Sequence, residues 1–170
     1  YDEDLFKLSV DIDAGEKVAI IGPNGIGKST LLRTLMGEVP MRDGKFNWTD
    51  NASVGYFAQD HADTFAGSET LLEWLEPNRK PRDNQEKVRA QLGRMLFSND
   101  DIIKKVSVIS GGEQARMLFA RLALRRDNVL LLDEPTNHLD MESIESLNMA
   151  LDDYTGTLIF VSHDREFVSS

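Results

Sequence analysis

Apolar residues along the chain fall into short continuous runs and into sets with helical spacing. Runs rich in aliphatic and β-branched residues predict buried strands at 17–21, 128–132 and 157–161. A helix is expected to start near Lys28 and to end by Gly37, because leucines follow at helical spacing and glycine is common just after a helix. These elements predict an α/β fold with a mostly parallel sheet.

The remaining segments are expected to add a small β layer and a helical subdomain. Residues 45–49 and 53–57 flank a polar Asp-Asn pair and predict a hairpin in a small antiparallel layer. Trp48 in this layer is expected to pack in the core rather than to stack on nucleic acid. Ser68 is expected to cap the first helix of the subdomain. The chain is thus predicted to be a single domain, with a core of residues 1–66 and 127–170 and a helical subdomain of residues 67–126.

A glycine-rich segment with the spacing G-x-x-x-x-G-K-[ST] lies between the first predicted strand and the first predicted helix. In that context it predicts a P-loop, whose backbone N–H groups converge on phosphate oxygens at the start of the helix. Lys28 would place its charge on the β- and γ-phosphates, the Ser29 hydroxyl would ligate Mg²⁺, and Thr30 would contact the α-phosphate. The predicted phosphate-binding residues are Gly22, Pro23, Asn24, Gly25, Ile26, Gly27, Lys28, Ser29 and Thr30.

Two carboxylates follow the predicted strand at 128–132. Asp133 and Glu134 stand at its carboxyl end, which is where ligands bind in open parallel sheets. Asp133 is expected to hold Mg²⁺, and Glu134 is expected to orient and polarise the water that attacks the γ-phosphate. Alone, these residues would fit a polar strand end before a turn equally well; beside a P-loop they favour an ATPase.

A second glycine-rich segment precedes the helix that is predicted to end near Arg126. Ser110, Gly111 and Gly112 come just before apolar residues at helical spacing, so the helix should start at these glycines. A helix N-terminus attracts anions, yet one chain has a single triphosphate to place in its own P-loop. The segment is therefore predicted to serve a nucleotide held by another domain; a helix cap without a ligand is the alternative.

Together these segments resemble the nucleotide-binding domain of the ABC ATPases over nearly the whole chain. In that family's order they are Walker A at 22–30, the Q-loop Gln59, the signature at 110–114, Walker B at 130–133 with Glu134, the D-loop Asp140 and the switch His163. The runs Asp-Glu-Pro-Thr-Asn-His-Leu-Asp and Ser-Gly-Gly-Glu resemble the ABC-F group, whose members join two such domains in one soluble chain and act on ribosomes. No long helical insertion follows Gln59, so the chain resembles the second, C-terminal ATPase domain of such a translation factor.

The resemblance implies that ATP is sandwiched between the Walker A of one domain and the signature of another. Ser110, Gly111 and Gly112 would touch the γ-phosphate of the nucleotide held by the facing domain, and Glu113 of the same signature is counted with them as a nucleotide-binding residue. Asp140 would contact that facing domain. The implied partner is a second ABC ATPase domain, in the parent chain or as a homodimer.

Three further residues receive roles from the resemblance, and one of them, His163, also follows the predicted strand at 157–161 closely. Gln59 would sense Mg²⁺ and the attacking water, and so joins Ser29 and Asp133 as a metal-binding residue. His163 would contact the γ-phosphate from its own domain and act with Glu134 in catalysis. Tyr1 lies at a distance before Walker A that suits stacking on adenine. ATP and Mg²⁺ are the implied ligands.

Composition limits the cellular compartments and the classes of binding partner to expect. The 170 residues include no cysteine, which excludes a disulfide framework and thiol chemistry, and no apolar run approaches the length that spans a bilayer. We therefore expect a cytoplasmic protein. The net charge of −10 disfavours nonspecific nucleic-acid binding, which relies on Lys and Arg. The most basic cluster, Arg79, Lys80 and Arg82, is expected to be a solvated loop, so ribosome contact would need a local basic surface or parts outside this chain.

The ends of the chain also differ from the family pattern. A strand before Tyr1 and the closing elements after Ser170 are absent, so we expect an excised domain rather than a whole gene product. Two alternatives to the ribosome-directed ATPase stay open. One is the ATPase subunit of a membrane transporter, and the other is a domain that binds ATP without turnover.

Overall fold

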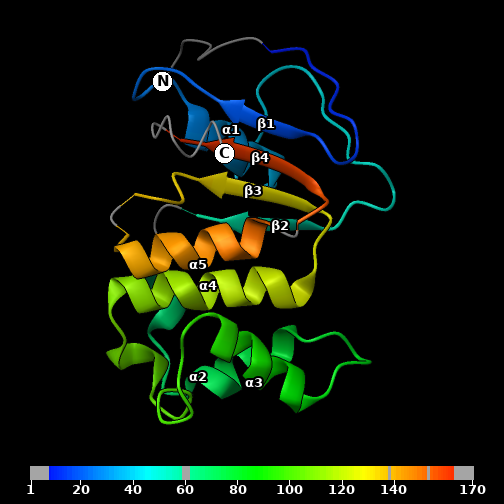
Figure 1. Ribbon diagram of the computed structural model, residues 1–170. Coiled ribbons are helices and arrows are strands. Elements are labelled where there is room, and N and C mark those ends of the chain that lie inside the picture. The colour runs from blue at the N-terminus through cyan, green and yellow to red at the C-terminus, as the bar shows by residue number, and fades with distance from the viewer. Residues whose placement is uncertain (1–7, 59–61, 138, 153, 163–170) are drawn as a thin grey trace. The chain divides into compact units, whose positions relative to one another are not determined.

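The computed structural model describes residues 8–58, 62–137, 139–152 and 154–162 of the chain. These residues form two compact units, which are labelled by their helices and strands in Figure 1. The first unit comprises the described residues of Tyr1–Gln59, Asp127–Pro135 and Thr155–Ser170, and the second unit those of Asp60–Arg126 and Thr136–Tyr154.

The first unit contains a four-stranded sheet and one α-helix. Its elements are β1 (Lys17–Ile20), α1 (Lys28–Leu35), β2 (Val54–Phe57), β3 (Val129–Asp133) and β4 (Thr157–Val161). The strands pair in the order β1-β4-β3-β2 and every pair is parallel, so their arrowheads point the same way in Figure 1. The carboxyl ends of all four strands therefore meet at one edge, where Ile20 and Asp133 both pair with Val161. The three predicted strands and the parallel α/β fold are confirmed.

The core of this unit lies between α1 and the central strands. All five residues of β3 and all five of β4 are buried, as expected for strands covered on both faces. The fully buried Leu32 of α1 joins four strand residues in one cluster, namely Val129, Leu131, Ile159 and Val161. Trp48 packs against this cluster and its Nε1 donates to the Leu35 carbonyl oxygen at 3.2 Å. This packing supports the core interpretation of Trp48.

The predicted hairpin is wrong. Residues 54–57 form a strand, β2, but it pairs in parallel with β3, with Tyr56 opposite Leu131. Residues 45–49 form no strand, and within the described residues the only antiparallel pairing is a bridge between Thr70 and Lys105. A local pattern of alternating residues is the same whichever strand lies alongside, so it reveals the strand but not its partner.

The second unit is helical. Its α-helices are α2 (Leu71–Leu75), α3 (Gln85–Arg94), α4 (Gly111–Arg125) and α5 (Met141–Asp152), and its short 3₁₀ helices are η1 (Ala62–Phe65), η2 (Glu76–Asn78) and η3 (Val106–Val108). Helix α4 packs against α5 on one side and against α2 and α3 on the other (Figure 1). Its apolar residues Ala115, Leu118, Phe119 and Leu122 are buried, as their helical spacing predicts. The unit includes α5 in addition to the helices within 67–126.

The start of α2 differs from its prediction. Thr70, not Ser68, is the N-cap residue: its side chain accepts from the Glu73 N–H at 3.2 Å, and Glu73 Oε2 accepts from the Thr70 N–H at 2.8 Å. This reciprocal pair is a capping box, which satisfies two backbone donors of the first turn. The cap therefore falls two residues later than the sequence pattern suggests.

Candidate functional site

The P-loop connects β1 to α1 and is shaped by glycines in the left-handed region. Gly25 has φ 80° and Gly27, the N-cap residue of α1, has φ 104°. A side chain at either position would be strained, so glycine is what allows the loop to turn into the helix. Lys28 then begins the helix, and its Nζ donates to the carbonyl oxygens of Gly22 at 2.8 Å and Pro23 at 2.9 Å. An ammonium group has three donors, so one donor remains for an anion in the loop.

A hydrogen bond ties the P-loop to the end of β3. Ser29 Oγ donates to Asp133 Oδ1 at 3.0 Å, although the two residues are 104 positions apart in the chain. Asp133 is only 2% exposed. Burial raises the pKa of its carboxyl group, against the opposing effects of the Ser29 hydroxyl and the Lys28 charge.

This pair of oxygens fits Mg²⁺. Mg²⁺ takes oxygen ligands at about 2.1 Å in octahedral geometry, which puts neighbouring ligands about 3 Å apart. The 3.0 Å between Ser29 Oγ and Asp133 Oδ1 matches that spacing. In the described part of the chain no three Asp, Glu or His side chains gather closely enough to hold a metal by themselves. The pair is therefore suited to an ion that also takes ligands from phosphate and water.

Tyr56 belongs to this site although no catalytic motif singles it out. It lies on β2, next to β3, and its hydroxyl donates a hydrogen bond to the Asp133 carboxylate. Burial, followed by the charge of Asp133, raises the pKa of the Tyr56 hydroxyl above its ordinary value. The sequence signal for Tyr56 is its position in Gly-Tyr-Phe-Ala-Gln, three residues before Gln59. Side chains along a strand alternate between the two faces of the sheet, so Tyr56 shares a face with alternate residues of β3.

Glu134 adopts a backbone conformation that is uncommon for its residue type. Its φ is 49°, and its N–H donates to the carbonyl oxygen of Val161, the last residue of β4, at 2.9 Å. A non-glycine residue in the left-handed region costs free energy and is often found at functional sites. The bond to β4 holds this turn at the edge where all four strands end.

The predicted signature segment is the N-terminus of α4 in the second unit. Ser110 is the N-cap residue; its Oγ accepts from the Glu113 N–H at 3.3 Å, and Glu113 Oε2 accepts from the Ser110 N–H at 2.7 Å. The cap uses a lone pair of the Ser110 hydroxyl and leaves its proton able to donate. Among the described residues, no hydrogen bond engages the N–H groups of Gly111 and Gly112. These donors are the ones that an anion at the helix N-terminus would use.

Asp140 lies in the same unit, at the start of α5. Its Oδ1 accepts from the Ser143 N–H at 2.8 Å. Hydrogen bonds from the Ser143 hydroxyl and then from its backbone N–H lower the pKa of the Asp140 carboxyl group. Asp140 is therefore held as a carboxylate at neutral pH.

Three predicted site residues, Tyr1, Gln59 and His163, lie outside the described residues. The strands that precede Gln59 and His163 are described: β2 ends at Phe57 and β4 ends at Val161. Both strands end at the edge of the sheet that carries Asp133. The other predicted site residues are described, and the structure brings Lys28, Ser29 and Asp133 together within the first unit.

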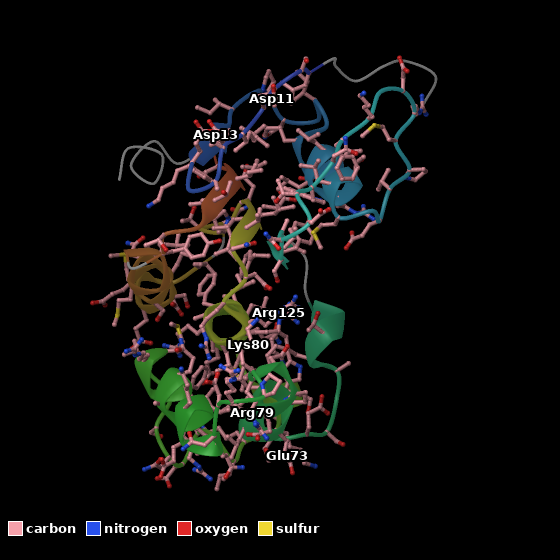
Figure 2. All side chains as sticks on the ribbon, turned by 90° about the vertical axis from the view of Figure 1, so that its right-hand side faces the viewer. Asp11, Asp13, Glu73, Arg79, Lys80 and Arg125 are labelled. Atoms are coloured by element: carbon pink, nitrogen blue, oxygen red, sulfur yellow. The ribbon has the colours of Figure 1, made fainter. Side chains whose placement is uncertain are left out.

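The basic loop is engaged within its own unit. Arg79 Nε donates to Glu76 Oε1 at 2.6 Å, and its Nη1 donates to the Asp83 carbonyl oxygen at 2.7 Å. Arg126 pairs with the Asp83 carboxylate. Arg79 and Lys80 are labelled in Figure 2, and Lys80 is exposed. Part of the positive charge of this loop is thus paired within the unit, and Arg79 has a structural role.

Comparison with known proteins identifies relatives along almost the whole chain. Residues 5–137 match the family model described as ABC transporter. The probable ATP-binding protein YbiT of Escherichia coli O157:H7 is 56% identical over 98% of this chain and 32% of its own length. The ABC transporter F family member 4 of Arabidopsis thaliana is 39% identical over 97% of this chain and 23% of its own length. The chain thus spans about a third or less of the length of these relatives.

Solved structures show the same fold. A complex of an archaeal ribosomal stalk protein with the archaeal ribosome recycling factor aABCE1 matches with a TM-score of 0.72 and 30% identity, over 90% of this chain and 30% of that one. A putative ABC transporter ATP-binding protein from Pyrococcus furiosus matches with a TM-score of 0.77 over 97% of this chain and 87% of that one. Its identity of 20% supports the fold alone. In the residues that the structure describes, no helix has the length and apolar character needed to cross a membrane.

Proposed function

The chain belongs to the ABC transporter family, with F-group ATP-binding proteins among its relatives, and from this premise we propose that it binds Mg-ATP and hydrolyses it between two ABC ATPase domains. One observation carries the proposal above all others. The hydroxyl of Ser29 in the P-loop contacts the buried carboxylate of Asp133 at 3.0 Å, so the phosphate-binding and metal-binding elements share one site.

In this proposal the P-loop binds the triphosphate. The backbone N–H groups of residues 22–30, other than Pro23, which has none, surround the phosphates at the start of α1. Lys28 places its remaining donor on the β- and γ-phosphates. Ser29, Asp133 and Gln59 would hold Mg²⁺, which would supply positive charge against the charge that develops on the phosphates during transfer. Tyr1 stacks on adenine.

The chemical step needs one water and a base. Glu134 orients the water and accepts its proton while the water oxygen bonds to the γ-phosphorus and the bond to the bridging oxygen of ADP breaks. The products are ADP and inorganic phosphate. His163 contacts the γ-phosphate, and Gln59 positions the water. The Val161 hydrogen bond supports this assignment, because it fixes the backbone of Glu134 at the carboxyl edge of the sheet.

The signature completes the site of a facing domain rather than its own. The proton of the Ser110 hydroxyl and the N–H groups of Gly111 and Gly112 donate to the γ-phosphate bound by the partner domain. Glu113 holds the helix start through its capping bond, and Asp140 contacts the facing domain.

We further propose that the parent protein works on the ribosome, in the cytoplasm, and that this chain is its second ATPase domain. The F-group relatives support this, as does the match to a ribosome recycling factor that was solved with a ribosomal stalk protein. The net charge of −10 indicates that direct rRNA contact relies on other parts of the parent protein.

Substitutions in the full chain test the ATPase proposal. Lys28→Ala should weaken Mg-ATP binding at least about tenfold, because it removes a charged hydrogen-bond donor to phosphate. Glu134→Gln should keep ATP affinity and lower turnover about a hundredfold or more, since it removes the base. Lys45→Ala, an exposed lysine of the same unit, is the matched control and should change neither quantity. Unchanged affinity of Lys28→Ala in calorimetry would contradict the P-loop assignment.

Ribosome binding is tested separately. The Glu134→Gln protein should co-sediment with ribosomes more strongly in Mg-ATP than in Mg-ADP, because the ATP state persists. Equal co-sedimentation would remove the ribosome proposal and leave the ATPase intact. Capture of membrane subunits would favour the transporter alternative, and tight ATP binding without wild-type turnover would favour a binding domain.

A further inference from the structure

A buried contact joins the start of α4 to the first turn of α5 in the second unit. The side chain of Ser143 is fully buried, and its Oγ donates to the Gly112 carbonyl oxygen at 3.1 Å. Next to it, Arg116 Nη1 on α4 donates to Glu142 Oε2 on α5 at 2.6 Å. The two helices are therefore linked at the turn that carries the signature glycines.

The Ser143 hydroxyl serves two acceptors. It lies within hydrogen-bonding distance of the Gly112 carbonyl and also of the Asp140 carboxylate. A hydroxyl has a single proton, so at any moment it donates to one of the two. Ser143 therefore connects the signature of α4 with the D-loop aspartate that precedes α5.

Close packing shows that Gly112 cannot be replaced without moving these groups. A Cβ atom at Gly112 would overlap Asp140 Oδ2 and would lie 3.1 Å from Ser143 Oγ. At Gly111 a Cβ atom would meet nothing within 4 Å. Only the second glycine of the signature is thus pressed against the start of α5.

We propose that Ser143 is a positioning residue for ATP hydrolysis, which holds the Gly112 carbonyl and through it the first turn of α4, the turn that carries the N–H groups of Gly111 and Gly112. The inference rests on the proposed signature function and adds a residue that this function did not include. The peptide plane of the Gly112 carbonyl also contains the Glu113 N–H, which donates to Ser110 Oγ, so the bond from Ser143 fixes the plane on which the cap of the signature serine depends. Without the Ser143 bond, that plane is oriented only by hydrogen bonds within α4.

Ser146 provides a matched control on the same helix. It is also fully buried, and its Oγ donates to the Glu142 carbonyl oxygen at 2.9 Å, four residues earlier in α5. Ser143→Ala and Ser146→Ala therefore delete the same atom from equally buried sites. Only Ser143→Ala breaks a bond to α4.

The experiment measures ATP turnover in the full chain, per bound ATP, so that misfolded protein is not counted. Ser143→Ala should lower kcat by about three- to tenfold, the effect of one hydrogen bond, with KM for ATP changed less than twofold. Ser146→Ala should leave both close to wild type. In the absence of nucleotide, amide hydrogen exchange across residues 111–114 should be faster in Ser143→Ala than in Ser146→Ala.

The outcomes separate this inference from the function on which it rests. If the wild type turns over ATP and the two alanine variants have the same kcat, Ser143 has no positioning role. A rise in KM without a fall in kcat would also overturn it, because the signature would then not be the affected part. If the wild type itself does not hydrolyse ATP, the proposed function fails first, and the Ser143 role fails with it.

Discussion

At the scale of single residues, the carboxylate of Asp133 depends on its hydrogen-bond donors. It is buried, and it accepts from the Ser29 hydroxyl and from the Tyr56 hydroxyl. Burial disfavours its charged form and the donors favour it, so the two hydroxyls offset part of the cost of burying this charge. The two hydroxyls come from different elements, α1 and β2, and the one on β2 depends on the sheet order that places β2 beside β3.

Tyr56→Phe tests the less expected of these donors. The substitution keeps the ring and removes the hydroxyl, so the Asp133 carboxylate loses a donor and its pKa should rise further. We expect the Mg²⁺ concentration for half-maximal ATP hydrolysis to rise about three- to tenfold, with about 1 kcal/mol lost in the free energy of unfolding.

A titration of ATPase activity with Mg²⁺ in the full chain measures this shift. Tyr154→Phe, in the second unit, is the control for loss of a tyrosine hydroxyl and should leave the Mg²⁺ dependence unchanged. Identical Mg²⁺ curves for Tyr56→Phe and wild type would show that the hydrogen bond has no part in metal binding.

At the scale of elements, the N-cap residue of α2 differs between the sequence prediction and the structure. Thr70 closes a capping box with Glu73, whereas the exposed Ser68 lies before the helix starts. Thr70→Ala should therefore lower the free energy of unfolding by about 1 kcal/mol. Ser68→Ala should change it by less than about 0.5 kcal/mol, as for other exposed positions.

Urea unfolding followed by fluorescence measures both changes. Trp74 lies in α2 and stacks on Phe65 with ring centroids 4.8 Å apart, so it reports on this helix. Equal losses for the two alanine variants, or a larger loss for Ser68→Ala, would mean that the cap is not at Thr70.

The sequence predicts those elements whose signal is local. The strands β1, β3 and β4 are continuous apolar runs, and α1 and α4 follow glycines with helical spacing, so their neighbours in space are not needed to find them. The partner of β2 is a long-range property, and the hairpin prediction failed for that reason. Helix α5 had no predicted counterpart, although Ile144, Leu147 and Leu151 have helical spacing.

The candidate site shows the same difference between residues with a local signal and residues set by long-range contacts. Lys28, Ser29 and Asp133 were predicted from their motifs, and the structure places the last two in contact. Tyr56 and Ser143 were not, because each acts through a neighbour that is distant in sequence. A motif identifies the residues that meet a ligand, whereas the residues that hold them in place are set by packing.

At the scale of the whole molecule, the two units differ in how their carboxylates are arranged. In the second unit hydrogen bonds and ion pairs lower the pKa values of four carboxyl groups, namely Glu73, Asp83, Asp101 and Asp140. In the first unit burial raises the pKa of Asp133. These two sets of carboxyl groups should therefore respond in opposite directions to acid.

The direction in which stability changes with pH depends on the pKa values of these carboxyl groups in the folded and unfolded states. The four carboxyls of the second unit have pKa values near 4 when unfolded and lower values when folded, so their stabilisation is present above about pH 4 and is lost as the pH falls further. Asp133 has a raised pKa when folded, so acid relieves the cost of burying its charge. As the pH falls below about 4, the helical unit should therefore lose stability relative to the sheet unit.

Two single-tryptophan variants measure this difference, because Trp48 lies in the first unit and Trp74 in the second. In Trp48→Phe, the urea midpoint reported by Trp74 should fall more steeply with decreasing pH than the midpoint reported by Trp48 in Trp74→Phe. Asp101→Asn should remove part of the Trp74 response, since Asp101 then no longer pairs as a carboxylate with Lys104 at 2.6 Å. Midpoints that fall in parallel would show one cooperative transition, and a steeper fall for Trp48 would contradict the assignment of the acid-sensitive carboxylates to the helical unit.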